Sequence, residues 1–173
     1  MKLSEKQIKA IEKLIPAKER QRFVENAINK ALEEHKALTA DTIEVYTDGG
    51  SRGNPGPAGG GFAIYRGGKL VSKGSEYFGE LTNNQSEYLA LRLALREAYD
   101  KFSDCKVKCF MDSQLAVEQM NGNYKVKSVN VRPLYDEVRR IADQFKGFTI
   151  SHIPREQNKI ADQLSNDAMD RAS

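Results

Sequence analysis

The sequence predicts a mixed α/β layer fold preceded by a small helical hairpin. Hydrophobic residues make up 39% of the 173 residues, which is enough for one compact domain with a core of its own. The apolar pattern is helical at first, has a period of two in three consecutive segments from residue 41, and is helical again after residue 81. The predicted order after the hairpin is βββαβααβα, which is typical of a mixed sheet flanked by helices.

Residues 4 to 36 are predicted to form two helices. Ser4 followed by Gln7 is a capping-box pattern, and the isoleucines that follow recur at helical spacing until Pro16 ends the first helix. An apolar stripe marks the second helix: Val24, Ala27, Ile28, Ala31 and Leu32. A hairpin this short buries little surface, so we expect its stripe to dock on the main domain, on a second copy of the chain or on a partner.

The remaining elements follow in order along the chain. Strands are predicted over residues 42–49, 60–68 and 69–80, and because Gly67 and Gly68 join the last two as a hairpin, the three indicate an antiparallel meander. The other elements are a long helix, a strand, two helices, a strand and a final helix, over residues 81–102, 105–113, 113–122, 131–145, 147–153 and 158–170.

Charge is distributed unevenly along the chain. Residues 1 to 40 hold nine Lys/Arg against six Asp/Glu, whereas the rest holds 18 of each, within a net charge of +3. If some acids of the larger part gather in one metal site, its remaining surface is mildly basic, as a polyanion binder requires. No apolar run approaches about 18 residues and MKLSEKQIKA is unlike a signal peptide, so we expect a cytoplasmic protein that uses no membrane.

Two acids lie at the ends of predicted strands. Asp48 is predicted as the last residue of the first strand, before Gly49 and Gly50, and Asp112 stands in the same place on the fourth strand, after Met111 and before Ser113. Taken alone, Asp-Gly is a turn signal. At the carboxyl ends of neighbouring parallel strands, however, loops diverge and leave a crevice in which ligands bind.

Two further acids lie on predicted helices. Glu87 shares a helix face with Leu91, Ala94, Leu95 and Ala98, so its carboxylate is expected to be buried, and a bound cation would offset that cost. Asp162 lies in the first turns of the last helix, where taken alone it is a dipole-stabilising acid. Oxygen ligands without a Cys/His cluster favour hard ions such as Mg²⁺ or Mn²⁺.

Four motifs, in order across roughly residues 42–170, resemble type 1 ribonuclease H: TDGGSRGNPGPAGGG, TNNQSE, MDSQ and NKIADQLS. The resemblance implies a ribonuclease H-like fold, with a five-stranded mixed sheet whose first three strands are antiparallel, and residues 41–173 as the catalytic domain. It implies an endoribonuclease that hydrolyses the RNA strand of RNA/DNA hybrids and leaves 5′-phosphate and 3′-hydroxyl ends. A hybrid-binding module with little catalysis is the alternative from another class.

The resemblance also assigns the site residues. Asp48, Glu87, Asp112 and Asp162 match the four catalytic carboxylates, which would hold two Mg²⁺ ions, with Mn²⁺ as a substitute. The glycines after the first acid would let an RNA backbone approach closely. The residues that match those contacting the minor groove and the 2′-hydroxyls are Asn54, Asn83, Asn84 and Gln114.

The chain departs from many members in two places. The loop SHIPREQNKIAD is short, and we favour Arg155 as an auxiliary catalytic group over His152, which we expect at the strand end as a core or structural histidine. The basic handle between residues 121 and 133 is short or absent, although Lys125, Lys127 and Arg132 could touch phosphates, and double-stranded RNA is therefore a possible second substrate.

Residues 1–40 have two competing roles. The first is homodimerisation through the apolar stripe of the hairpin. The second is added duplex affinity through Lys9, Lys13, Arg20 and Arg22.

Overall fold

The computed structural model describes residues 4–171, without the side chains of residues 37 and 38. The chain divides into two compact units at the boundary between Thr39 and Ala40. No helix in the described part of the chain is long and apolar enough to cross a membrane.

The first unit is a pair of helices, α1 (Glu5–Leu14) and α2 (Ala17–Thr39). The predicted capping box is confirmed, because the Gln7 N–H donates to Ser4 Oγ at 3.3 Å and the Ser4 N–H donates to Gln7 Oε1 at 2.9 Å. None of the side chains described in this unit is buried. The pair therefore has no core of its own.

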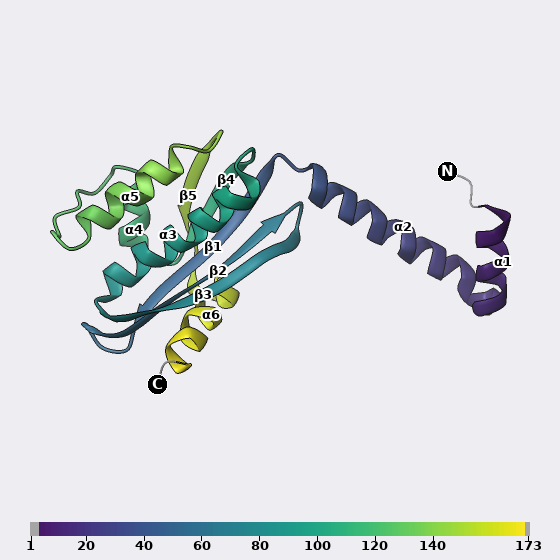
Figure 1. Ribbon diagram of the computed structural model, residues 1–173, viewed down its shortest axis with the longest axis horizontal. Helices are drawn as coiled ribbons and strands as arrows, with labels where there is room; N and C mark the ends of the chain where they lie inside the picture. The colour runs from purple at the N-terminus through teal and green to yellow at the C-terminus, as the bar shows by residue number, and fades with distance from the viewer. Residues whose placement is uncertain (1–3, 172–173) are drawn as a thin grey trace. The chain divides into compact units, whose positions relative to one another are not determined.

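The second unit contains the five-stranded mixed sheet that the sequence predicts (Figure 1). Its spatial order is β3-β2-β1-β4-β5, with β1, β2 and β3 antiparallel, β4 parallel to β1 and β5 parallel to β4. The strands are β1 (Thr42–Ser51), β2 (Gly56–Arg66), β3 (Lys69–Leu81), β4 (Lys106–Met111) and β5 (Phe148–His152).

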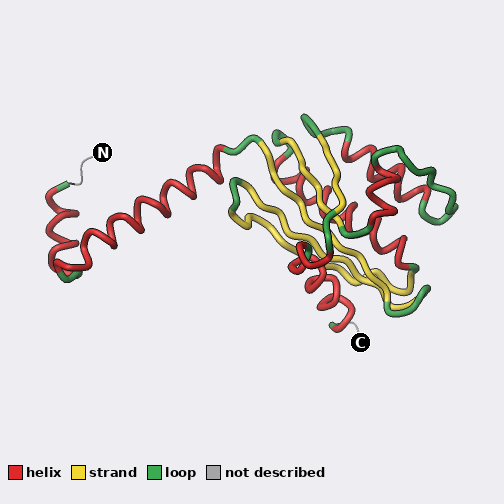
Figure 2. Tube along the Cα trace, turned by 180° about the vertical axis from the view of Figure 1, so that it is seen from behind, coloured by secondary structure: helices red, strands yellow, loops and turns green. Residues whose placement is uncertain are grey.

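Helices cover both faces of the sheet (Figures 1 and 2). One face packs against α3, which also contacts α5, and the other packs against α6. The helices are α3 (Asn83–Phe102), α4 (Gln114–Met120), α5 (Arg132–Ala142) and α6 (Lys159–Asp170), with a short 3₁₀ turn, η1 (Arg155–Gln157), before the last.

The first strand is longer than the sequence pattern predicts. Asp48 is not its last residue, because β1 continues to Ser51, and β2 likewise begins at Gly56 rather than at residue 60. The extension consists largely of glycine paired with glycine, Gly49 opposite Gly60 among them. An alternation of apolar and polar side chains cannot reveal a strand that has few side chains.

Two glycines of these strands allow close packing of helices on the sheet. A Cβ on Gly49 would lie 2.2 Å from the Ser86 carbonyl oxygen of α3, and one on Gly61 would lie 2.5 Å from the Ala161 carbonyl oxygen of α6. Glycine therefore lets the two helices approach the sheet closely from opposite faces. Helix packing requires glycine at Gly49 and Gly61. The close approach of an RNA backbone to the glycines after Asp48 stays a prediction.

The central sheet forks at one end. The parallel pairing of β1 with β4 stops at Tyr46 opposite Phe110, whereas β1 remains paired with β2 as far as Ser51. The core lies between the sheet and α3 on the near side of this fork, with Val45, Leu91 and the reduced Cys109 fully or almost fully buried. On the side facing β1, the carboxyl end of β4 is therefore free of backbone pairing, although β4 stays paired with β5 through Met111.

Candidate active site

Two carboxylates meet at the fork because of the parallel register. Asp48 and Asp112 each lie two residues beyond the last paired positions, Tyr46 and Phe110. Side chains two residues apart on a strand share a face, so Asp48 lies on the same face of β1 as Tyr46. Asp112, the first residue after β4, brings its carboxylate close to that of Asp48. Asp48 is 7% exposed, and Asp112 is half-buried.

The third carboxylate comes from α3. A capping box between Thr82 and Gln85 fixes the start of the helix. Glu87 lies in its second turn and is 6% exposed, and the four apolar residues predicted to share its face are completely buried, which confirms the predicted buried stripe. The Gly49 N–H of β1 donates to Glu87 Oε2 at 3.3 Å, so the helix and the strand hold this carboxylate together.

The three acids form one cluster. Asp48, Glu87 and Asp112 each offer a carboxylate oxygen, and these oxygens lie within 4.8 Å of one another. Burial, with the charge of Asp112 next in effect, raises the pKa of Asp48 to about 7. Burial and then the charges of both aspartates raise the pKa of Glu87 well above its usual value. The cluster thus holds negative charge at a high electrostatic cost.

Asp162 is not one of the three converging carboxylates, although its charge also raises the pKa of Asp48. Its carboxylate is bound by the Arg155 guanidinium of η1, seven residues earlier in the chain. That hydrogen bond raises the pKa of Arg155, and the charges of Asp48 and Asp112 act in the same direction. Arg155 therefore reaches the acids from the rim. His152 is the last residue of β5, as expected, but it is exposed, so the expectation of a core position is wrong.

A cavity of about 210 Å³ opens beside the three acids and is also lined by Arg155 and Asn83. Asn83 is exposed at the start of α3, where its N–H donates to Asn54 Oδ1 at 3.1 Å and its Oδ1 accepts from the Ser51 N–H at 3.3 Å. These contacts tie the loop between β1 and β2 to the helix.

The other two predicted substrate residues lie nearby on helix starts. Asn84 is exposed in the first turn of α3, and Gln114 is exposed as the first residue of α4, two residues after Asp112. Neither lines the cavity beside the acids. Both face solvent, as contact residues for a large substrate would.

The donor set fits divalent cations. Three carboxylates, two of them buried, converge without a lysine or arginine paired to any of them in the described part of the chain. Oxygen-only sites of this kind suit Mg²⁺ or Mn²⁺. A cation placed among these oxygens would offset both the burial and the repulsion that raise the pKa of Asp48.

Two residues that contact the acids were not predicted from the sequence. The buried Asn158 amide donates to Asp112 Oδ1 at 3.1 Å, and a hydrogen bond with the Ser165 hydroxyl lowers the pKa of Asp48. Asn158 stands four residues before Asp162, and Ser165 three residues after it. Helical spacing could have brought Ser165 to the same face of α6, whereas nothing in the sequence distinguished Asn158 from an ordinary helix cap.

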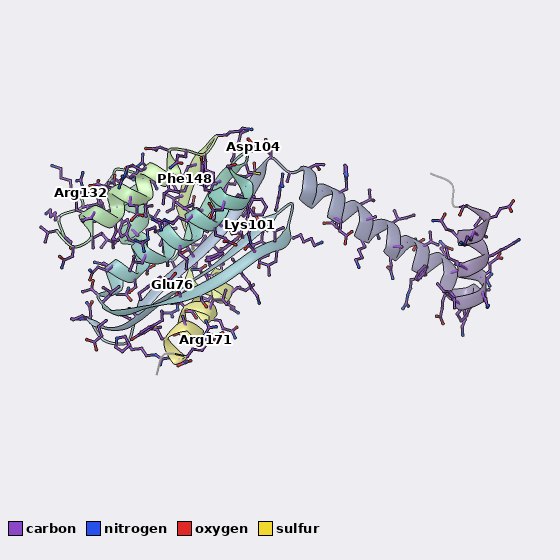
Figure 3. The ribbon with its side chains drawn as sticks, viewed as in Figure 1. Glu76, Lys101, Asp104, Arg132, Phe148 and Arg171 are labelled. Carbon is purple, nitrogen blue, oxygen red and sulfur yellow. The ribbon has the colours of Figure 1, made fainter. Side chains whose placement is uncertain are left out.

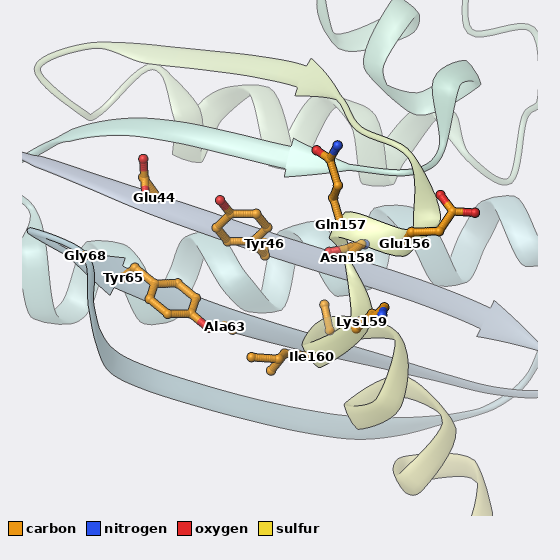
Figure 4. Close-up of a pocket in the computed structure, with 11 residues that line it drawn as sticks. Glu44, Tyr46, Ala63, Tyr65, Gly68, Glu156, Gln157, Asn158, Lys159 and Ile160 are labelled. Atoms are coloured by element: carbon orange, nitrogen blue, oxygen red, sulfur yellow. The ribbon is translucent and has the colours of Figure 1, made fainter.

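A second, larger cavity lies on the face of the sheet that packs against α6 (Figure 4). It has a volume of about 340 Å³ and is lined by Tyr46 and Tyr65, with the start of α6 at one end. Tyr46 stacks on Phe110 with ring centroids 4.9 Å apart. None of the clustered acids lines this cavity.

The segment between α4 and α5 was expected to carry a short basic handle or none. Residues 121–131 form no helix or strand between α4 and α5. Arg132 lies at the start of α5 (Figure 3). Its Nε donates to both carboxylate oxygens of Asp136 at 3.0 Å. Its guanidinium is therefore already engaged within the helix.

Comparison with known proteins agrees with this fold and site. A family model described as reverse transcriptase-like matches residues 46–168. The chain is 39% identical over 133 residues to the bifunctional protein Rv2228c of Mycobacterium tuberculosis, covering 76% of this chain and 36% of that protein. It is 39% identical over 132 residues to ribonuclease HI of Halobacterium salinarum, covering 75% of this chain and 65% of the relative.

Two relatives match over nearly their whole length. A ribonuclease H of Hydrogenovibrio crunogenus is 32% identical over 143 residues, covering 74% of this chain and 95% of the relative. The structure of LC11-RNase H1 in complex with an RNA/DNA hybrid is 44% identical, has a TM-score of 0.71, and covers 75% of this chain and 98% of that chain. The sheet order, the cluster of acids and these matches together show that the chain belongs to the type 1 ribonuclease H family.

Proposed function

We propose that this protein is a metal-dependent endoribonuclease that hydrolyses the RNA strand of RNA/DNA hybrids and leaves 5′-phosphate and 3′-hydroxyl ends. The observation that carries the proposal is the convergence of Asp48, Glu87 and Asp112, with a carboxylate oxygen from each within 4.8 Å of the others, beside an open cavity. A relative of 44% identity was solved with an RNA/DNA hybrid, which supports the substrate class.

The four carboxylates Asp48, Glu87, Asp112 and Asp162 would hold two Mg²⁺ ions, or Mn²⁺ in their place. Bound divalent ions supply a water of lowered pKa and electrostatic stabilisation of the departing oxygen. The protein itself contributes rigidity, because β1 and α3 fix two of the carboxylates in nearly dry surroundings. Arg155 adds a fixed positive charge at the rim, where a phosphate would lie.

Recognition of RNA is assigned to the exposed amides beside the cavity. Asn83 uses its side-chain oxygen on the Ser51 N–H, which leaves its NH₂ group for an acceptor on the substrate. Asn84 and Gln114 extend this polar rim along the starts of two helices, and Asn54 holds the rim together from the preceding loop. The proposed targets are the minor-groove edge and the 2′-hydroxyls.

Double-stranded RNA is a second candidate substrate. The short irregular segment over residues 121–131 offers few contacts that would depend on a DNA strand. Recognition then relies on the 2′-hydroxyls of the cleaved strand, which both kinds of duplex contain.

We further propose residues 41–173 as the catalytic domain and residues 1–40 as a dimerising hairpin. The stripe on α2 is exposed, with Ile28 at 50% and Leu32 at 59%. Arg20 is a weak candidate for binding phosphates, because it donates to the carbonyls of Ile15 and Glu12 instead. Sedimentation equilibrium should give a dimer for the intact chain and a monomer for Ile28→Glu/Leu32→Glu. An intact chain that sediments as a monomer would exclude dimerisation.

The activity is tested by gel assay of end-labelled RNA/DNA, RNA/RNA, DNA/DNA and single-stranded RNA with Mg²⁺, Mn²⁺ or EDTA. We expect metal-dependent cleavage of the RNA strand in the hybrid, which Asp48→Asn abolishes. Asp100→Asn is the matched control, because it makes the same chemical change at an exposed position of α3. Hybrid binding without cleavage under any metal would instead support a binding module, and cleavage of RNA/RNA would extend the substrate range.

A further inference from the structure

Asn158 lies where the elements that carry three of the four acids meet. It is the last residue before α6, and its side chain is only 1% exposed. Its backbone carbonyl accepts the Asp162 N–H at 3.0 Å, and its own N–H donates to the Arg155 carbonyl at 2.9 Å. In Figure 4 it is drawn at the entry to α6, over the sheet.

The side chain of Asn158 does not cap the helix. Asparagine is favoured at this position because its side-chain oxygen can accept a backbone N–H of the first turn, yet no such bond is present. Instead, its Nδ2 donates to the Thr47 carbonyl at 3.0 Å and to Asp112 Oδ1 at 3.1 Å. The orientation of the amide follows from these partners, because both are acceptors and only the NH₂ end can serve them.

Both acceptors lie beyond the point at which β1 and β4 stop pairing. Thr47 is the first residue of β1 after the last parallel pair and precedes Asp48, and Asp112 is the first residue after β4. No backbone bond of the parallel ladder joins the two strands at this level. The Asn158 amide bridges the fork instead of a backbone bond. Its NH₂ group binds both the Thr47 carbonyl, next to Asp48, and the Asp112 carboxylate.

We infer that Asn158 is a positioning residue of the metal site, which orients the Asp112 carboxylate and sets its distance from Asp48. The inference rests on the proposed function of the same acids. Groups that hydrogen-bond to metal ligands fix their direction, and losing such a group typically weakens metal affinity or activity by about 10- to 100-fold. Asn158 itself touches neither the proposed substrate residues nor the cavity beside the acids.

The test measures Mn²⁺ binding directly, by titration calorimetry on the full chain without substrate. Asn158→Leu keeps the size of the side chain and removes its hydrogen bonds, and Asn158→Ala is a second variant should the first fail to fold. Asn121→Leu is the matched control, because the Asn121 amide also donates to a strand carbonyl, that of Ile150 at 3.3 Å, but in β5, which carries none of the acids. Urea unfolding of every variant records the loss of stability separately.

We expect Mn²⁺ affinity to fall about tenfold or more in the Asn158 variants and to stay unchanged in Asn121→Leu. In the cleavage assay kcat should fall in the Asn158 variants while KM for the hybrid stays the same, because the substrate rim is untouched. Wild-type affinity in a folded Asn158 variant, or an equal loss in the Asn121 control, would overturn the positioning role alone. Absence of Mn²⁺ binding by the wild-type chain would overturn the proposed metal site and this inference with it.

Discussion

Replacing Asp48 with asparagine should stabilise the metal-free protein while it abolishes catalysis. Burial and the neighbouring Asp112 raise the pKa of Asp48 from 3.8 to about 7 in the folded chain. A folded-state pKa above the unfolded one means that folding is favoured at low pH and that this advantage is lost as pH rises through the folded pKa. The rise corresponds to about 4 kcal/mol of destabilisation above pH 7, which asparagine, having no charge, would not incur.

The effect can be read without interference from the N-terminal helices. All seven tyrosines follow residue 45 and the chain has no tryptophan, so tyrosine fluorescence reports only on the unit that contains the site. In urea with EDTA, we expect Asp48→Asn to exceed the wild type by up to about 4 kcal/mol at pH 8, and the difference to shrink towards zero near pH 4. Mg²⁺ should stabilise the wild type and leave the variant unaffected.

The result that would refute this reasoning is equal stability of Asp48→Asn and wild type at pH 8 in EDTA. The carboxylate would then lie in wetter surroundings than the structure gives. The control is Asp100→Asn, at an exposed position near the C-terminal end of α3. It should change the free energy of unfolding by less than about 0.5 kcal/mol at both pH values.

Three other predictions concern substitutions of single residues. Arg155→Ala should lower kcat on the hybrid by about tenfold or more, whereas His152→Ala should leave it unchanged; single-turnover assays of the two variants would separate them, and the reverse order would contradict the assignment. Gly49→Ala should cost more than about 3 kcal/mol in urea unfolding because a helix carbonyl occupies the space, whereas Gly68→Ala, with open space but a φ of +82°, should cost only about 1–2 kcal/mol. Tyr88→Phe should lower the free energy of unfolding by about 1 kcal/mol, because it removes the buried hydrogen bond from the Tyr88 hydroxyl to Gln119 of α4. Unchanged stability in urea unfolding would indicate that water replaces this bond.

The sequence pattern predicted the elements well where side chains alternate or recur. The helix face below Glu87 is buried as expected, and the hairpin at Gly67 and Gly68 has positive φ at both glycines. The pattern failed at the glycine-rich end of β1, because a strand without side chains has no alternation to detect. It also failed at His152, since one residue at the end of an edge strand carries no signal of burial.

The approach of the acids could not be derived from periodicity. Gly49 and Glu87, 38 residues apart, meet only because α3 crosses the sheet beside β1. The parallel pairing of β1 with β4, whose ends bring Asp48 and Asp112 together, is likewise a tertiary property. The family resemblance supplied the grouping of the acids instead. It did not supply the separation of Asp162 from the other three or its pairing with Arg155, which depend on the side-chain positions at η1 and α6.

The fork at the end of the parallel ladder also bears on amide hydrogen exchange. Up to Tyr46, β1 is bonded on both sides, to β2 and to β4, whereas beyond it β1 is bonded along the ladder only to β2. Amides on the closed side of the fork should exchange only through global unfolding, and those of residues 49–51 through smaller openings. The acids lie at the border between these regimes, so a bound cation should slow exchange most at the tip of β1 and least in the sheet interior.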